Sequence, residues 1–519
     1  MKSICAAIFV ALSLFYTAPM SRAQDVTLRS RDGDVEISGN LMGFDGEFYR
    51  VDTIYGELTV DGSGVDCDGP GCPNLDTYIA RVTFSGAPTI GRVLMPALLE
   101  AFAIKNDYGV TRESESEALF TYVISDKVTN RVIGEFTFRL SNTDAGFADL
   151  LANEADIVLS LREVRQPEAD RARAAGLGNL TAKGRSHVLA LDALVPVVSP
   201  TNPVQAITTS ELAMVLAGEI ADWTALGGPD APISVHILAA TSGLGQAAVE
   251  RLVTSAGKTL VAGAVRHETE RQLLDAVEAD PFSIGVTSRS DTGNAWPLAL
   301  RGECGFTLSA TRQAVKTEDY PLTAPLFLYQ PARRFPKLVR EFLAYLSEPS
   351  AQLVIRRAGF VDQSPEQISI NAQGDRFANA ILQGGQETQL TDLQDMVRRL
   401  ASLERLTTTF RFETGSIRLD AQSRSNVLQL ARLMEMGQFD TRRMVFVGFS
   451  DGEGPAAKNL EIAQRRADAV KTAVTRAAET ANLSRIDIEV FAFGEAMPMA
   501  CDDSDWGRQV NRRVEVWVR

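Results

Sequence analysis

Apolar and polar residues alternate one by one along residues 25–66, as in Val26-Thr27-Leu28. Pairs such as Asp45-Gly46 interrupt the alternation at short intervals. A period of two with such interruptions is typical of short strands joined by tight turns, and it predicts a small all-β barrel of about five strands over residues 24–78. The stretch carries no chemical motif, so a spacer or interaction role is the simpler interpretation.

From residue 79 to residue 364 the pattern changes to apolar runs separated by stretches with helical spacing. Residues 155–159 and 193–198 are typical of buried strands, whereas residues 89–103 place apolar side chains three and four positions apart, as in an amphipathic helix. Alternating strands and helices predict a parallel sheet covered by helices. We therefore expect an α/β domain over residues 79–364.

A polar segment separates this domain from the last part of the chain. Gly374 and the pair Gly384-Gly385 predict irregular, flexible backbone. Leu393, Met396 and Leu400 form one apolar stripe, which predicts a helix. We interpret residues 365–402 as a partly helical linker and residues 403–519 as the final domain.

The first residues predict export from the cell. Lys2 precedes a mostly apolar run from Ile4 to Phe15, and Ser21-Arg22-Ala23 offers small residues at the −3 and −1 positions of a cleavage site. This pattern predicts a secretory signal peptide at residues 1–23. No later stretch reaches the length of about 18 apolar residues that a membrane span needs.

The charge of the chain argues against nucleic acid as a partner. Removal of the signal peptide takes away Lys2 and Arg22 and no acidic residue, so 52 basic and 66 acidic residues become 50 and 66, and the net charge moves from −14 to −16. Affinity for nucleic acid depends on contacts between basic side chains and phosphates. We therefore expect no nucleic-acid binding.

Four cysteines follow the signal peptide: Cys67, Cys72, Cys304 and Cys501. An even number in an exported chain indicates disulfides, and four cysteines allow three pairings. Cys67 and Cys72 flank a turn, which favours a local bridge. Cys304 and Cys501 would then either form a bridge that clamps two domains together or remain as two buried free thiols. The spacing does not fit a zinc site, and we expect no metal or other cofactor.

An ordered set of polar residues marks the final domain. In chain order its members are Gly448-Phe449-Ser450-Asp451, Asn459, Arg465-Arg466, Gly494-Glu495, Pro498 and Asn511-Arg512-Arg513. In this order they resemble the OmpA C-terminal-like domain, a peptidoglycan-binding module of the bacterial envelope. The resemblance covers residues 403–519 and implies an α+β fold with the order β-α-β-α-β.

The resemblance also implies a ligand. Peptidoglycan stem peptides often carry diaminopimelate, whose free end is a zwitterion, so its capture needs a carboxylate for the ammonium and a cation for the carboxylate. By position in the family pattern these are Asp451 and Arg466, whereas Arg465 points elsewhere on the helix. The predicted peptidoglycan-binding residues are Asp451, Asn459, Arg466, Asn511 and Arg512.

Short motifs within residues 79–364 also occur in a family order. They are Ser85-Gly86-Ala87-Pro88-Thr89, Ala155-Asp156-Ile157, Thr208 to Leu212 with Asp222-Trp223, and Thr241-Ser242-Gly243. The segment resembles the periplasmic phosphate-binding-protein-like family, the solute-binding proteins of ABC transporters. The resemblance implies two α/β lobes with a cleft between them and a small anion as ligand.

The predicted cleft departs from that family. Leu161, Leu238 and Leu244 stand where phosphate-binding relatives use polar contacts, and Asp144 would repel an anion. The polar residues that remain in the predicted cleft are Ser85, Thr89, Thr143, Arg162, Ser242 and Gly243, with Arg162 as a replacement cation. Two interpretations stay open: a cleft that still binds a small anion, or an interaction scaffold without a ligand.

Nothing in the sequence predicts catalysis, because His187, His236 and His267 lie outside any nucleophile or metal motif. We expect a non-enzymatic protein of the periplasm that associates with peptidoglycan, within reach of the outer membrane, and presents a solute-binding-like domain. One alternative is a phosphate or other anion receptor of an ABC transporter. Another is a structural adaptor that links the wall to an envelope protein partner.

Overall fold

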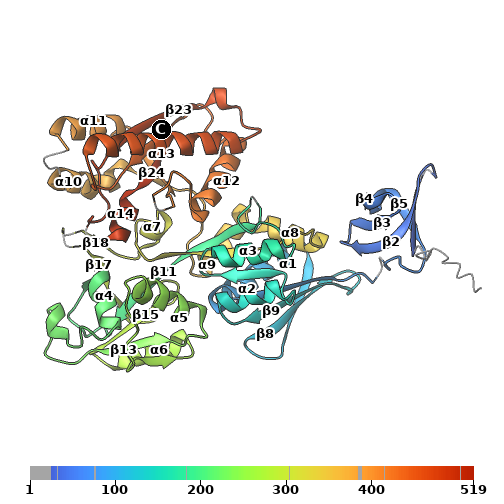
Figure 1. Cartoon of the computed structure of the whole chain (residues 1–519), viewed down its shortest axis with the longest axis horizontal. Helices are drawn as coiled ribbons and strands as arrows, with labels where there is room; N and C mark the ends of the chain where they lie inside the picture. The colour runs from blue at the N-terminus through green and yellow to red at the C-terminus, as the bar shows by residue number, and fades with distance from the viewer. Residues whose placement is uncertain are drawn as a thin grey trace, which may run out of the picture. The chain divides into compact units, whose positions relative to one another are not determined.

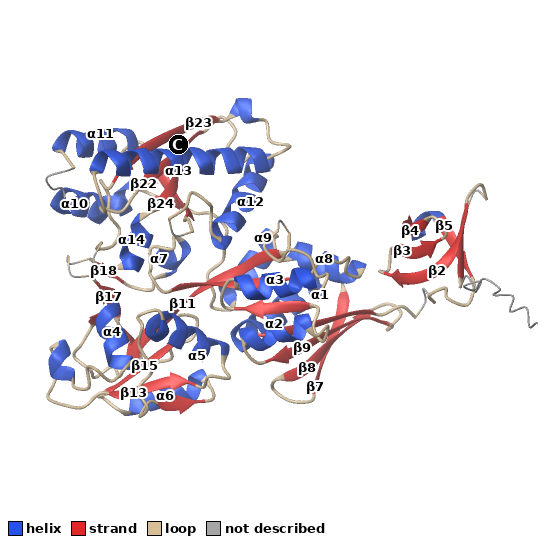
Figure 2. Ribbon diagram, viewed as in Figure 1, coloured by secondary structure: helices blue, strands red, loops and turns tan. Residues whose placement is uncertain are grey.

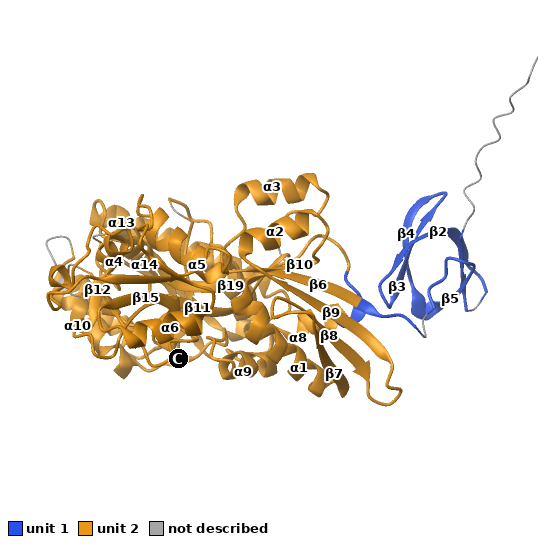
Figure 3. Ribbon diagram, turned by 90° about the horizontal axis from the view of Figure 1, so that it is seen from below, with its two compact units in different colours: residues 1–80, 335–338 blue, residues 81–334, 339–519 orange. Residues whose placement is uncertain are grey.

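The computed structural model describes residues 25–519 except residues 32, 75–76, 183, 303, 305, 384–387, 414 and 503. Figure 1 labels the elements, and Figure 3 colours the two compact units, residues 1–80 with 335–338 and residues 81–334 with 339–519. The signal peptide predicted at residues 1–23 lies outside the described residues. No helix in the described ranges is long and apolar enough to cross a membrane.

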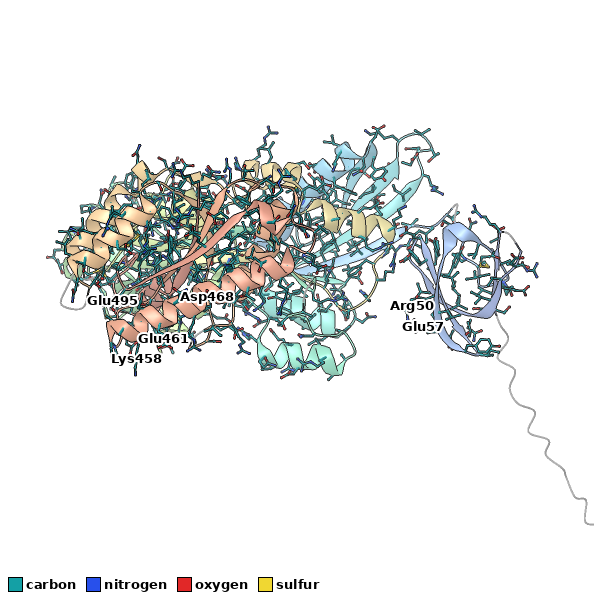
Figure 4. All side chains as sticks on the ribbon, turned by 90° about the horizontal axis from the view of Figure 1, so that it is seen from above. Arg50, Glu57, Lys458, Glu461, Asp468 and Glu495 are labelled. Carbon is teal, nitrogen blue, oxygen red and sulfur yellow. A yellow bond between two sulfur atoms is a disulfide. The ribbon has the colours of Figure 1, made fainter. Side chains whose placement is uncertain are left out.

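The first unit is an antiparallel sheet in the order β4-β3-β2-β1-β5. Its strands are β1 (Val26–Ser30), β2 (Glu36–Phe44), β3 (Phe48–Thr53), β4 (Gly56–Asp61) and β5 (Val65–Asp68). Val26, Leu28, Tyr49 and Val51 form its small core. Figure 4 labels Arg50 on β3 and Glu57 on β4, which form an exposed ion pair.

The five predicted strands are present, but the barrel is not closed. β4 and β5 are the two edges of the sheet, and no strand pairing joins them among the residues that the structure describes. The alternating pattern specifies which residues form strands. It does not specify whether the edge strands meet, because closure depends on strand tilt and stagger. The Cys67–Cys72 disulfide, with 5.8 Å between the Cα atoms, closes the turn after β5.

The second unit begins with an 11-stranded sheet whose main path is β14-β13-β15-β11-β19-β10-β6-β9-β8-β7. The strands along this path are β6 (Ala80–Gly86), β7 (Tyr108–Ser114), β8 (Leu119–Asp126), β9 (Val132–Leu140), β10 (Ile157–Ser160), β11 (Ser186–Val198), β13 (Ser234–Leu238), β14 (Val265–His267), β15 (Ser283–Ser288) and β19 (Thr323–Tyr329). β16 (Trp296–Pro297) pairs with β11. A second, small sheet contains β12 (Ala206–Thr208), β17 (Ala299–Arg301) and β18 (Thr307–Leu308).

The long strand β11 joins two lobes. Its first part pairs with β19 and its last part, from Leu194 to Val198, pairs with β15. Helices α1 (Met95–Lys105), α2 (Thr143–Leu151), α3 (Gln166–Ala174), α8 (Lys337–Tyr345) and α9 (Pro349–Arg357) belong to the first lobe, and α4 (Thr209–Leu216), α5 (Gly243–Ala248), α6 (Glu270–Ala279) and α7 (Arg312–Lys316) to the second. Two lobes of strands and helices are what the sequence predicted.

The strand directions differ in part from the prediction of a parallel sheet. β6 and β10 are parallel, as are β13, β14 and β15. β7, β8 and β9 form an antiparallel meander instead. The reason is that no helix separates these three strands, and neighbouring strands joined directly by turns run antiparallel.

The C-terminal domain is a five-stranded sheet in the order β20-β21-β24-β22-β23. Its elements are β20 (Gln367–Ile368), β21 (Glu404–Phe410), α12 (Ala421–Glu435), β22 (Arg443–Phe449), α13 (Ala456–Ala477), β23 (Asp487–Gly494), α14 (Asp505–Asn511) and β24 (Arg513–Val518). The order from β21 to β23 is β-α-β-α-β, as the resemblance implied. β24 then inserts between β21 and β22. Figure 2 labels β24 next to β22 in this sheet.

Both faces of this sheet are covered. Successive residues of β22 point to opposite sides, so Met444 and Phe446 pack with α12 and α13, whereas Val445 and Val447 pack with the other core. That other core is built by α10 (Gly374–Gln383) and α11 (Leu390–Leu400). The segment predicted as a linker is thus part of the domain, because its apolar stripe covers a sheet face that would otherwise be exposed.

Buried charges connect the C-terminal domain to the second lobe. Asp319, which follows α7, accepts a hydrogen bond from Arg405 Nη1 at 2.9 Å and lies 3.4 Å from Arg411. Arg405 also lies 3.4 Å from Glu515 on β24. Burial alone would raise the pKa of Asp319, but the neighbouring Arg405 lowers it. The Cys304–Cys501 disulfide, with 5.6 Å between the Cα atoms, joins the same two domains.

Candidate functional site

The residues predicted to bind peptidoglycan gather where β22 ends and α13 begins. β22 is apolar and buried along most of its length, and the chain then turns outward at Ser450. The Ser450 N–H donates to Gly494 O at 2.8 Å, which ties this turn to the end of β23. Asp451 follows at once and is 8% exposed. The carboxylate is therefore held at the edge of the sheet, next to the first turns of α13.

A glycine allows α13 to approach β22 at this point. A Cβ added to Gly448 would lie 2.1 Å from the carbonyl oxygen of Ala463 on α13. Backbone atoms of a helix cannot move aside individually, so any side chain here would push the whole helix away. Gly448 therefore sets the distance between the strand that carries Asp451 and the helix that carries Arg466.

Gly448→Ala should lower the free energy of unfolding by about 1–3 kcal/mol, the usual cost of overpacking a core. Thermal unfolding of residues 24–519 measures this loss. Gly263→Ala is the matched control, because an added Cβ there meets no heavy atom within 4 Å. Equal stability of the two variants would contradict the close packing of α13 on β22.

Asp451 is paired in this structure. One of its oxygens, Oδ2, accepts a hydrogen bond from Arg512 Nη1 at 2.5 Å, and both side chains are largely buried. Oδ1 receives no hydrogen bond from the residues that the structure describes. One oxygen of the carboxylate therefore positions Arg512, and the other remains available as an acceptor.

Arg466 is buried, and among the described residues no carboxylate lies within ion-pair distance of its guanidinium. It is 6% exposed, and within the described part of the chain its guanidinium makes no hydrogen bond or ion pair. Its Cζ atom lies 5.1 Å from the centre of the Phe412 ring. Burial lowers the pKa of Arg466, Arg512 adds to the effect, and Asp451 opposes it. A buried and unpaired cation is costly, and an anionic ligand would relieve that cost. Arg465, the next residue, is exposed.

The two predicted asparagines are engaged within the protein. Asn459 donates from Nδ2 to Glu495 Oε2 at 2.9 Å, and Figure 4 shows Glu495 near the N-terminal part of α13. Asn511 is fully buried, and its side chain bonds to Met499 N, to both backbone groups of Ala500 and to Asp502. The structure therefore places Asn511 beneath the site, where it shapes the loop from Met499 to Asp502.

Sequence reasoning gave no role to two residues of this site. Phe412 supplies the aromatic face under Arg466, and Glu495 holds Asn459. Glu495 directly follows the last residue of β23, so its place at the strand end was a usable signal. Phe412 follows β21, which β24 separates from β22 in the sheet. Only the three-dimensional packing brings Phe412 to Arg466.

In the two-lobed domain, the predicted cleft residues are occupied by internal contacts. Ser85 is buried and donates from Oγ to Asp149 Oδ2 at 2.6 Å. The hydroxyl of Thr143 accepts from Leu161 N at 3.1 Å. Ser242 caps α5 by accepting from Gly245 N at 3.5 Å. Thr89 is half-buried at the end of the β6 loop and makes no capping hydrogen bond.

Arg162 does not act as a free replacement cation. Its guanidinium donates to Glu168 Oε2 at 2.9 Å and Oε1 at 2.7 Å, and it also contacts Asp144 Oδ1. Burial alone would lower the pKa of Arg162, but the two carboxylates raise it. Two carboxylates of the first lobe, those of Asp144 and Glu168, balance the charge of Arg162. Arg162 therefore offers no net attraction to an anion.

The two lobes touch where the ligand would lie. Gln246 on α5 donates to Asp144 Oδ2 at 2.5 Å, and Arg165 forms an ion pair with Glu250, so polar contacts cross between the lobes. Next to them, a Cβ added to Gly243 would lie 3.1 Å from the Cβ of Ala87 and 3.4 Å from Leu161. Leu161, Leu238 and Leu244 are buried. The lobes thus meet through close-packed apolar residues around Gly243, flanked by these polar contacts.

Comparison with known families agrees with both domain types. Residues 76–349 match the family model described as a PBP superfamily domain, which is more than half of the chain. Residues 411–512 match the OmpA family. The chain belongs to the PBP superfamily and carries an OmpA-family domain after the two-lobed domain.

Three similar proteins illustrate the match. The phosphate-binding protein PstS of Borreliella burgdorferi is 22% identical over 241 residues, which is 46% of this chain and 82% of the relative. Outer membrane porin F of Pseudomonas fluorescens is 30% identical over 119 residues, which is 23% of this chain and 35% of the porin. A solved ABC-type phosphate transport receptor from Vibrio cholerae is 20% identical, with 55% of this chain and 100% of the receptor covered and a TM-score of 0.41.

Proposed function

We propose that this chain is a non-enzymatic protein of the periplasm that anchors to peptidoglycan through its OmpA-family domain. The single observation that carries the proposal is Arg466, a buried cation without a partner among the described residues, beside a carboxylate with one free oxygen. This arrangement fits a ligand with one negative and one positive group close together. The free end of diaminopimelate in a stem peptide has that chemistry.

Each charged group of the site has a role in this proposal. Arg466 holds the ligand carboxylate, because its planar guanidinium can donate two parallel hydrogen bonds. Asp451 accepts the ligand ammonium on Oδ1 while Oδ2 keeps its bond to Arg512. Asn459 and Asn511 act indirectly, since their amides hold the surrounding loops.

Cosedimentation with purified peptidoglycan sacculi tests the proposal. We expect the mature chain, residues 24–519, to pellet with sacculi and free diaminopimelate to release it. The whole mature chain is the right material, because Arg405 and Arg411 of the C-terminal domain use Asp319 of the second lobe. Failure to pellet, or release by salt alone, would contradict the proposed site.

For the two-lobed domain we propose an interaction scaffold rather than a transport receptor. The internal pairing of Arg162 and the close packing around Gly243 support this choice. The bonds to the C-terminal domain support it further. A transport receptor has to diffuse to its permease, whereas a domain that is bonded to a wall-binding domain stays at the wall. In this role the domain presents its outer surface to an envelope partner.

Orthophosphate should bind the mature chain with a dissociation constant no tighter than about 1 mM. The reason is that the buried Leu161, Leu238 and Leu244 offer no hydrogen bonds to an anion. Isothermal titration calorimetry measures the affinity. Micromolar binding would contradict the scaffold and favour an anion receptor.

A further inference from the structure

A cavity of about 910 Å³ lies between the first lobe and the C-terminal domain, away from both sites described above. One wall comes from β11, β19 and α9, and the other from α12, which packs against β11. Figure 1 shows α12 above the first lobe in that view. A volume of this size lies within the range of about 300–1,000 Å³ typical of small-molecule sites.

The inner part of the cavity is apolar. Leu189, Leu328, Leu346 and Val427 line it and are themselves buried, so the apolar surface continues into the cores of both domains. Met436, at 62% exposure, lies at the open end. A pocket with an apolar inner part and polar groups at its rim is the usual form of a small-molecule site.

The Cys304–Cys501 disulfide and the Asp319–Arg405 ion pair join the C-terminal domain to the second lobe. Beside the cavity, α12 contacts β11 directly, and Ala421 N donates to Glu163 Oε1 at 3.0 Å. The cavity is thus bounded by contacts between the C-terminal domain and the first lobe.

Arginines and glutamates both line the mouth of the cavity. Arg424 lies 3.8 Å from both Glu163 and Glu413 and donates to Leu419 O at 2.7 Å. Glu348 is paired with Lys105, and Glu435 accepts from Thr480 N at 3.2 Å. Arg432 is exposed and makes no hydrogen bond or ion pair with any residue in the described ranges, so it is the cation at the mouth that is left without a partner.

We propose that this cavity binds an amphiphile with a single acyl chain and an anionic head group. The chain lies along the apolar inner part, and the head group meets Arg432 at the mouth. A carboxylate and a phosphate ester share this chemistry, so a free fatty acid and a lysophospholipid are the two sources to compare.

The test is calorimetric titration of delipidated mature chain with palmitate, laurate, lysophosphatidylglycerol and the neutral dodecyl maltoside. We expect one palmitate per chain and an affinity that falls about fourfold for each methylene removed. Tighter binding of palmitate than of lysophosphatidylglycerol identifies a fatty acid as the source, and the reverse order identifies a phospholipid. Equal binding of dodecyl maltoside and laurate would overturn the proposal.

Two variants locate the binding. Arg432→Glu should weaken palmitate binding about tenfold or more, as expected for the loss of a charge-assisted contact. Arg432 is exposed, so its reversal leaves the fold intact, and Arg465→Glu on α13 is the matched control. Ser425→Trp, which places a large ring in the cavity, should abolish binding. Unchanged palmitate binding in either variant would overturn the proposal. A dimer of the chain that Ser425→Trp dissociates would also overturn it, because a second copy of the chain would then be the occupant of the cavity.

Discussion

Replacing Arg466 by alanine removes most of the binding of the mature chain to peptidoglycan sacculi, with an expected loss of at least about 30-fold, or about 2 kcal/mol, in affinity. The reason is that the ligand carboxylate then enters a largely buried site without a cation. Cosedimentation over a series of sacculus concentrations gives the apparent affinity.

Stability separates this effect from misfolding. Arg466 makes no hydrogen bond with the described residues, so Arg466→Ala should not lower the unfolding temperature by the several degrees expected when a buried ion pair is broken. Arg465→Ala removes the same charge, but from the exposed face of the helix, and this variant should bind sacculi normally. Similar losses in the two variants would contradict the assignment of Arg466 to the ligand.

Asp451→Asn should weaken binding to a similar extent and also reduce stability. The amide cannot balance the ligand ammonium, and it leaves Arg512 without its ion pair. Free diaminopimelate should no longer compete for the residual binding. Competition that persists in this variant would show that the ammonium is held by another residue.

Replacing Cys304 and Cys501 together by serine should lower the free energy of unfolding of the second unit by about 5 kcal/mol in the chain-entropy description. The large expected effect follows from the separation of the two cysteines by 197 residues, because a long closed loop restricts the unfolded chain most. Guanidinium unfolding followed by tryptophan fluorescence measures the change.

The other disulfide provides the matched control. Cys67 and Cys72 are separated by only 5 residues, so their replacement should cost about 2 kcal/mol. All four tryptophans, Trp223, Trp296, Trp506 and Trp517, lie in the second unit, so this control should leave the fluorescence transition unchanged. An unchanged transition after replacement of Cys304 and Cys501 would mean that ion pairs alone hold the junction.

Local patterns in the sequence were sufficient for features that depend on one element and its neighbours. The run before Asp451 predicts a strand end, and helical geometry directs Arg466 and Arg465 to different faces, so their different burial follows from the sequence. Such features require no knowledge of distant partners. The order of strands and helices from β21 to β23 came instead from the resemblance to the OmpA C-terminal-like domain.

Features that depend on distant partners were not accessible in this way. Arg162 looked like a free cation because the sequence does not show that Asp144 and Glu168 converge on it. The segment 365–402 looked like a tether because the sheet face that α11 covers is formed by strands that come later in the chain. In both cases tertiary contacts, and not local propensity, decide the role of the residue.

The ion pair between Asp319 and Arg405 limits how the two domains can be exchanged during evolution. Arg405 lies inside the sheet of the OmpA-family domain and shares its counter-charge between Glu515 of the same sheet and Asp319 of the PBP domain, so exchange of either domain for a relative would remove one partner from a buried network of charges. Recombination would have to transfer both halves together, or change both residues at once. We expect Asp319 and Arg405 to be inherited as a pair in proteins with this domain order, whereas free-standing OmpA-family domains have an uncharged residue at the position of Arg405.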